Sequence, residues 1–510
     1  MDRRAFIAAG AGALASSWLS GCGGGGGSAG TPVAPPPPGP SLGVYAPLAS
    51  QMKGQLLVAG STGFDAFRLP ANARYDSVVP QALARCVAAE DVVAAVNFAR
   101  ANQIRFTPRS GGHSYLGAST IAAGLVIDTG PMDSVRMDGD IAVVSAGAKL
   151  ADIYRALLAL PQPRLLPSGS CPTVGISGIA LGGGFGFFQR AYGLTCDALV
   201  GATLVTADGQ TVSCDATRHP DLFWALRGGG GGMLGLVTEL RLRTQPLPAM
   251  SSSAVQYGGN DIPAVLAAWQ AWGAALPDSV WSQAQIGAFG NGQIGMQVIA
   301  VAADGAAALS AHWNRFLAAT GATMVSNSPP LDASPADLLL GRCATLSAAQ
   351  CRLPSQSAGG TMTRVSMTAS SDFFTALPAA GVQALVNALT ARSQAGRFGG
   401  VLLDLMGGAI ARVAKDATAF PHRDALFSAQ YLTENMAGDL PAALDDNARW
   451  THGLRDTMAP WSTGGAYVNY PDAAIPNPAT AYYGENVARL RAVQRSVDPN
   501  GLFKTPIVTI

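Results

Sequence analysis

The alternation of hydrophobic and polar positions divides the first half of the chain into short strands and helices. Apolar runs typical of strands lie at 77–87, 105–109, 124–128, 141–145, 199–206 and 210–213. The turn Asp208-Gly209 joins the last two runs into a predicted hairpin. Helices are expected over 151–160 and from Glu90, where Val93, Val96 and Ala99 share one face. This mixture predicts α+β structure up to about residue 247.

From about residue 250 the pattern changes. A helix is expected over 262–276, with Val265, Trp269 and Trp272 on one face. It alternates with strand pairs such as 282–286 and 295–301. We therefore expect a second region, an antiparallel sheet covered by helices, that contacts the substrate.

The N-terminus has the features of an export signal. Asp2-Arg3-Arg4 resembles a twin-arginine motif, and the apolar run that follows is too short for a good membrane span. Leu19-Ser20-Gly21-Cys22 resembles a lipobox, which would make Cys22 a lipidated first residue; the alternative is a cleaved soluble signal. Residues 23–42 form a Gly-rich and Pro-rich tether. We expect an exported periplasmic or cell-envelope lipoprotein of a bacterium, attached to the membrane only through Cys22.

Composition narrows the classes of partner. The chain has 510 residues, 48% of them hydrophobic and 13% charged, which suffices for two or three domains with sizeable cores. The formal net charge of +1 argues against nucleic-acid binding, because that function needs a basic patch. The chain therefore has the composition of a globular protein, and its charge gives no sign of a nucleic-acid partner.

The cysteines and histidines indicate no metal site. Cys343 and Cys351 are close enough in sequence for a disulfide, although two buried thiols would fit equally well. The apolar neighbours of Cys86, Cys196 and Cys214 favour core positions. No CxxC, HExxH or Cys/His cluster is present.

Two glycine-rich loops each carry one nucleophilic side chain. They are Arg109-Ser-Gly-Gly-His113-Ser-Tyr115 and Gly169-Ser-Cys171-Pro-Thr-Val-Gly175. Glycine lets the backbone approach a ligand closely. A helix expected from Pro172 would raise the thiolate fraction of Cys171. The alternative is a glycine turn with an exposed histidine, and a buried free cysteine.

Longer segments of the chain, which include the Cys171 loop, resemble those of a known protein family. Four such segments resemble the berberine bridge enzyme-like FAD-linked oxidases of the PCMH-type, vanillyl-alcohol oxidase superfamily. They are the run from Cys171 to Asp197, the segment Asp221-Leu-Phe-Trp-Ala-Leu-Arg227 with its glycines, and the segments at 467–472 and 483–503. The chain departs from that family at Met233, where asparagine is common, and at 405–406. The resemblance implies a two-part FAD-binding domain (43–247 and 456–510) with an inserted substrate domain (248–455), after a signal (1–22) and a linker (23–42).

The resemblance also implies roles for residues. His113 would bond to the 8α-methyl of the flavin and Cys171 to C6, Asn469 would touch the flavin, and Tyr470 would be the catalytic base once a neighbour lowers its pKa from about 10. A valine at 174 would permit oxygen access. Further cofactor contacts are expected from Arg109, Ser110, Gly111, Gly112, Ser114, Gly117, Thr173, Val174, Gly175, Gly178, Gly183, Gly186, Tyr192, Asp197 and Val237. The substrate pocket would include Tyr115, Ser428 and Gln430.

By this resemblance the chain is an enzyme with bicovalent FAD that oxidises an alcohol, a hemiacetal or a related C–H donor, with sugars as the first class to test and O2 as electron acceptor. One alternative is a dehydrogenase that passes electrons to a membrane carrier. A second is a non-catalytic binding lipoprotein on the same fold. A third is a flavin-free surface protein that binds polysaccharide or is structural.

Overall fold

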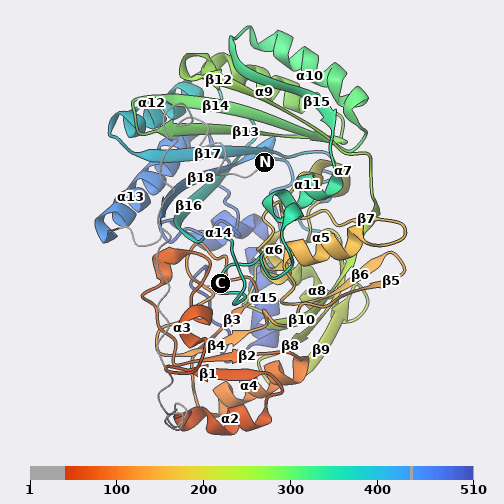
Figure 1. Ribbon diagram of the computed structural model, residues 1–510, viewed down its shortest axis with the longest axis vertical. Helices are drawn as coiled ribbons and strands as arrows, with labels where there is room; N and C mark the ends of the chain where they lie inside the picture. Colours follow the sequence, from red (N-terminus) through yellow and green to blue (C-terminus); the bar gives the residue numbers. More distant parts are fainter. Residues whose placement is uncertain (1–40, 437–439, 509–510) are drawn as a thin grey trace, which may run out of the picture.

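The computed structural model describes residues 41–436 and 440–508 (Figure 1). The predicted signal, Cys22 and all but the last two residues of the predicted linker lie outside these residues. Two smaller sheets occupy the lower half of the molecule in Figure 1, and one large sheet with its helices occupies the upper half.

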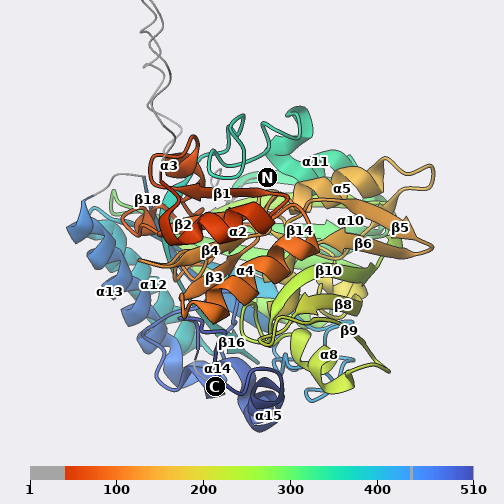
Figure 2. The same ribbon diagram turned by 90° about the horizontal axis from the view of Figure 1, so that it is seen from below.

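The first small sheet has the strand order β1-β2-β4-β3. Strands β2 and β3 both run parallel to β4, and β1 runs antiparallel to β2. Helices α2 and α4 pack together below this sheet, in front of it in Figure 2. The elements are β1 (Gln55–Val58), β2 (Ala82–Arg85), β3 (Phe106–Arg109), β4 (Leu125–Asp128), α2 (Ala46–Gln51), α3 (Phe64–Phe67) and α4 (Ala89–Ala101).

The second small sheet is antiparallel, with the order β5-β6-β10-β8-β9. A two-stranded pair, β7 with β11, accompanies it. The strands are β5 (Val135–Asp138), β6 (Ile141–Ser145), β7 (Arg164–Leu165), β8 (Leu199–Val205), β9 (Thr211–Asp215), β10 (Leu236–Arg243) and β11 (Gln245–Pro246). The helices are α5 (Leu150–Leu158), α6 (Ile176–Gly182), α7 (Gln189–Tyr192) and α8 (Pro220–Leu226).

The large sheet is antiparallel throughout, in the order β15-β12-β14-β13-β17-β18-β16. Helices α9, α10, α12 and α13 pack on it, and the buried side chains of Trp269, Trp313 and Phe316 belong to this core. The strands are β12 (Ser251–Gly258), β13 (Val280–Phe289), β14 (Ile294–Ala302), β15 (Met324–Asp332), β16 (Val365–Phe374), β17 (Phe398–Leu405) and β18 (Phe427–Met436). The helices are α9 (Ile262–Ala274), α10 (Ala306–Thr320), α11 (Pro335–Leu340), α12 (Ala379–Gln394) and α13 (Pro441–Met458).

The C-terminal segment returns to the half of the molecule where the chain begins. It contains α14 (Pro478–Tyr483) and α15 (Val487–Val497), and α15 lies beside α8 in Figure 2. Arg489 pairs with Asp221 at 2.8 Å, and the ring of Phe503 meets that of Phe106 edge-on. The half of the molecule that holds the small sheets is thus built from both ends of the described chain.

Most of the predicted elements are confirmed, and the α+β class with a helix-covered antiparallel sheet is the observed fold. The expected helix face of α4 is partly wrong: Val96 and Ala99 are buried, but Val92 is buried where Val93 lies only half-buried. The buried face of α4 includes Val92 because this side chain packs in the hydrophobic core formed with the first sheet. None of the described helices is long and apolar enough to cross a membrane.

The structure contains one disulfide and, among the other described cysteines, free thiols. Cys343 and Cys351 form a disulfide, so the first of the two alternatives holds. Cys86, Cys196 and Cys214 are buried free thiols, as predicted, and burial raises the pKa of each.

Candidate active site

A cavity of about 380 Å³ lies where the loops of the small sheets meet the large sheet. This volume is within the ordinary range for a ligand site. Its wall combines the two glycine-rich loops, the glycines after α8, a segment between α11 and β16, and the segment around Tyr470. Five parts of the chain that are far apart in sequence therefore meet at one site.

The two predicted nucleophiles converge on one threonine. Thr173 Oγ1 lies 3.0 Å from His113 Nε2 and 3.8 Å from Cys171 Sγ. The His113 ring is half-buried because one side faces the cavity. Its pKa is lowered to about 4, first by burial and then by the charge of Lys149. The imidazole is therefore neutral near pH 7, which is the nucleophilic form.

The helix expected at Pro172 begins instead at Ile176, so the prediction for the surroundings of Cys171 is wrong. Residues 172–174 form a turn whose carbonyls are engaged by α5: Leu150 N–H donates to Val174 O and Ala151 N–H donates to Pro172 O. This pairing to another element holds the turn out of the helix, so no helix begins at the residue after Cys171.

The backbone of the His113 loop is arranged to receive an anion. Among the residues that the structure describes, the amides of Gly111, Gly112, His113 and Ser114 donate to no protein acceptor. Unpaired N–H groups on a cavity wall need a ligand or water as acceptor. A Cβ on Gly111 would lie 2.2 Å from Gly175 N, so the two loops touch only because both positions are glycine. These features fit the pyrophosphate of FAD.

The segment from Tyr467 to Tyr470 lines another part of the wall. Asn469 Nδ2 donates to Ile179 O of α6 at 3.1 Å and to Tyr467 Oη at 2.9 Å. Tyr470 is buried, and its ring lies edge-on to those of Tyr467 and Tyr115. The predicted base therefore sits at the cavity beside the residue predicted to touch the flavin.

The structure brings most of the predicted residues to the cavity wall. In addition to His113, Cys171, Asn469 and Tyr470, the wall includes Arg109, Ser110, Gly111, Gly112, Ser114, Tyr115, Thr173, Val174, Gly175, Gly178 and Val237. Arg109 also supports the structure beneath it, because its guanidinium donates to the carbonyls of Phe67, Arg68 and Ser119.

Seven predicted residues lie outside the wall, namely Gly117, Gly183, Gly186, Tyr192, Asp197, Ser428 and Gln430. Asp197 forms a two-point ion pair with Arg423, with both distances 2.8 Å, in the interior. Gly186 is needed for packing, since a Cβ there would lie 1.8 Å from Ser168 O. Gly183, Gly186, Tyr192 and Asp197 were expected to contact the cofactor because they lie in a long family-like segment. The ion pair of Asp197 and the close packing at Gly186 give these two residues structural roles.

Ser428 and Gln430 belong to a buried polar row on the large sheet next to Tyr115. Gln430 Nε2 donates to Tyr115 Oη at 2.8 Å, and Ser428 pairs in register with Asp404. On the next strand, Gln283 Nε2 donates to Asp404 Oδ1 at 2.7 Å, and Gln285 Nε2 donates to Gln283 Oε1. The two glutamines were missed, although their alternation with apolar residues in β13 was a usable signal.

Lys149 was also missed. It is 2% exposed, and its Nζ donates to the carbonyls of Gly147 and Gly130. Burial lowers its pKa to about 8. A lysine between two predicted elements carries no sequence signal of burial, because its environment is made by distant segments.

Comparison with known proteins gives matches along most of the chain. Residues 80–215 match the family model described as an FAD binding domain, and residues 466–507 match the model for berberine and berberine-like proteins. The FAD-linked oxidoreductase YgaK of Bacillus subtilis is 32% identical over 83% of this chain and 90% of its own length. The chitooligosaccharide oxidase of Gibberella zeae is 30% identical over 84% of this chain and 86% of its own length.

Comparison with solved structures finds proteins of the same kind. The BBE-like 1 protein of Physcomitrella patens superimposes with a TM-score of 0.81 at 26% identity, over 91% of this chain and 98% of that chain. A glucooligosaccharide oxidase from Acremonium strictum superimposes with a TM-score of 0.80 at 26% identity, over 91% of this chain and 98% of that chain. That enzyme is described as carrying 6-S-cysteinyl, 8α-N1-histidyl FAD.

Proposed function

The chain belongs to the berberine bridge enzyme-like FAD-linked oxidoreductases, and from this premise we propose that it is an oxidase whose FAD is bound covalently through both His113 and Cys171. The substrate that we propose is a sugar or oligosaccharide, oxidised at an alcohol or hemiacetal carbon with O2 as electron acceptor. The observation that carries the proposal is the convergence of His113 and Cys171 on Thr173 at a cavity that Tyr470 also lines.

The protein's own residues hold the cofactor. The unpaired amides of 111–114 would receive its pyrophosphate, and the neutral imidazole of His113 and the thiol of Cys171 would each replace one hydrogen on a carbon of the flavin. Each bond would release two protons and two electrons, and O2 would take up the electrons. Asn469, anchored on α6, lies on the same wall. When bound, FAD supplies the hydride acceptor and returns two electrons to O2, which leaves as hydrogen peroxide.

Tyr470 removes the proton from the substrate hydroxyl while the neighbouring C–H leaves as hydride, so that a C–OH group becomes C=O. Tyr115, which lines the cavity, accepts a hydrogen bond from the buried Gln430 at 2.8 Å, and its fixed hydroxyl supports a substrate rich in hydroxyl groups. Changing Tyr470 to phenylalanine should lower kcat by about 10²–10⁴ and leave flavin attachment unchanged.

The first experiment measures the flavin that remains on the denatured chain. We expect the intact mass of the wild type to include one FAD, His113→Ala and Cys171→Ala each to retain it through the remaining bond, and only the double variant to release it. A folded wild-type protein that is supplied with FAD but releases all flavin on denaturation would disprove covalent attachment.

A second experiment separates an oxidase from a dehydrogenase. The protein is reduced anaerobically with a panel of mono- and oligosaccharides, and the recovery of flavin absorbance is followed after mixing with air-saturated buffer. Rapid recovery together with formation of hydrogen peroxide is the expected result. Slow recovery in air, with fast recovery on adding a quinone, would contradict the proposed role of O2.

A further inference from the structure

A segment between α11 and β16 passes over the cavity. This segment, which we call the strap, comprises residues 341–363 and contains the Cys343–Cys351 disulfide. Leu353, Met362 and Thr363 of the strap line the cavity wall. The strap lies outside the two stretches that match the family models, residues 80–215 and 466–507.

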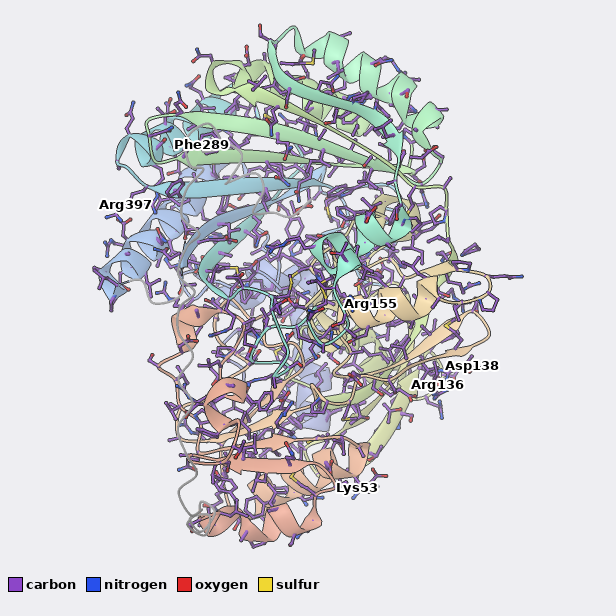
Figure 3. The ribbon with its side chains drawn as sticks, in the orientation of Figure 1. Lys53, Arg136, Asp138, Arg155, Phe289 and Arg397 are labelled. Carbon is purple, nitrogen blue, oxygen red and sulfur yellow. A yellow bond between two sulfur atoms is a disulfide. The ribbon has the colours of Figure 1, made fainter. Side chains whose placement is uncertain are left out.

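Two arginines attach the strap to α5, and Figure 3 shows Arg155 on this helix below α11. The guanidinium of Arg155 donates to Cys343 O at 2.7 Å and to Leu346 O at 2.8 Å. From the strap, Arg352 pairs with Asp152 of α5 at 2.6 Å, and both side chains are largely buried. Helix α5 in turn bonds the Cys171 loop through Ala151 N–H and Leu150 N–H. The strap is thus held against a rigid support at the base of the site.

One strap side chain connects both loops that carry the nucleophiles. Gln356 Nε2 donates to Gly111 O at 2.8 Å and to Thr173 O at 2.9 Å, while its Oε1 accepts from Leu353 N–H at 3.2 Å. Gly111 lies two residues before His113, and Thr173 lies two residues after Cys171. The two acceptors are carbonyls, which determines the orientation of the amide.

We propose that Gln356 is a positioning residue that holds the His113 and Cys171 loops at the separation at which one flavin can bond to both. The inference rests on the proposed function, since it concerns the two bonds named there. Bond formation demands that reacting atoms be held within a fraction of an ångström of a productive geometry. A single amide that binds one carbonyl in each loop constrains their separation directly.

Both loops also bond to the segment 146–151, through Ser110 Oγ to Ala146 O and Leu150 N–H to Val174 O, but Gln356 binds a backbone carbonyl in each loop with one side chain. Gly111 and Gly175 touch through backbone atoms alone, which limits how closely the loops approach but does not keep them together. Within the described residues, the direct hydrogen bond between the loops joins Thr173 Oγ1 to the His113 ring, a side chain that must itself react. The bonds from Gln356 involve backbone carbonyls and persist whatever state the imidazole is in.

The test uses the FAD itself as a cross-link. Trypsin cleaves after Arg109, Arg136, Arg164 and Arg190, so a flavin bonded at both sites joins peptide 110–136 to peptide 165–190. The ratio of joined peptides to peptides carrying flavin at one site is measured by mass spectrometry for the wild type, Gln356→Ala, Gln356→Glu and the control Gln350→Ala. Gln350 is an exposed strap residue, and among the described residues its side chain bonds only to Ser347 N–H.

We expect Gln350→Ala to match the wild type and both Gln356 variants to lower the ratio about tenfold or more. Gln356→Glu is decisive because it keeps the shape of the side chain but removes its N–H donors, so a merely space-filling residue would tolerate it. A lowered melting temperature would show that Gln356→Ala folds poorly. The peptide ratio of Gln356→Glu then tests the inference, and Gln356→Asn tests whether a shorter amide still reaches both carbonyls.

A wild-type ratio in folded Gln356→Glu would overturn the inference. Parallel loss of non-covalent FAD binding would also overturn it, since the residue would then support the cavity rather than the spacing of the loops. Absence of the joined peptides in the wild type would instead refute the proposed bicovalent attachment itself.

Discussion

His422 gives the sharpest prediction for stability, because it is a half-buried histidine with a lowered pKa that lies outside the proposed chemistry. Its Nε2 lies 3.1 Å from Tyr482 O, and its ring stacks on Phe373 with centroids 4.2 Å apart. Burial lowers its pKa from 6.5 to about 4. Between these two pH values the unfolded chain takes up a proton that the folded chain does not. Each pH unit is worth about 1.36 kcal/mol, so the folded state loses about 3 kcal/mol as the pH falls from 6.5 to 4.

The assay is urea unfolding of the wild type and His422→Gln at half-unit steps from pH 8 to pH 4. At neutral pH the variant should be less stable because packing against Phe373 is lost. The stability difference should shrink by about 3 kcal/mol on going to pH 4, because only the wild type loses the contribution of His422. Asp372, whose carboxyl pKa burial raises to about 7, changes stability in the opposite direction, but it is common to both proteins and cancels. A difference that stays constant with pH would refute the reasoning, and exposed His219→Gln is the control.

Three other changes test packing and access at the site. Arg423→Met should cost about 3–5 kcal/mol in unfolding free energy, because it leaves Asp197 buried without its partner; a loss below about 1 kcal/mol in urea unfolding would argue against an interior ion pair. Gly111→Ala should lower FAD content roughly tenfold or more, since the new Cβ meets Gly175 N; wild-type flavin absorbance would contradict that contact. Val174→Leu should slow reoxidation by O2 in stopped flow and leave anaerobic reduction by substrate intact, because Val174 lines the cavity; equal slowing of both steps would count against a role in oxygen access.

Local sequence patterns were enough to predict many of the strands and helices. The strands at 105–109 and 141–145 and the hairpin around Asp208-Gly209 were predictable because period-two alternation and turn residues are encoded within a few positions. The start of α6 was not predictable in this way. Proline after Cys171 favours a first helical turn, yet hydrogen bonds from α5 keep 172–174 in a turn.

The residues of the site also fall into those that local sequence predicts and those that depend on packing. Residue type and glycine content are local properties, so they were enough to predict that two glycine-rich loops carry His113 and Cys171 and that a segment around Tyr470 accompanies them. The packing of distant segments places Thr173 between the two nucleophiles, pairs Asp197 with Arg423, and lets Gln356 bind both loops. Gln356 and Gly111 are separated by 245 positions, and contact over such a distance depends on how whole elements pack, which no local pattern records.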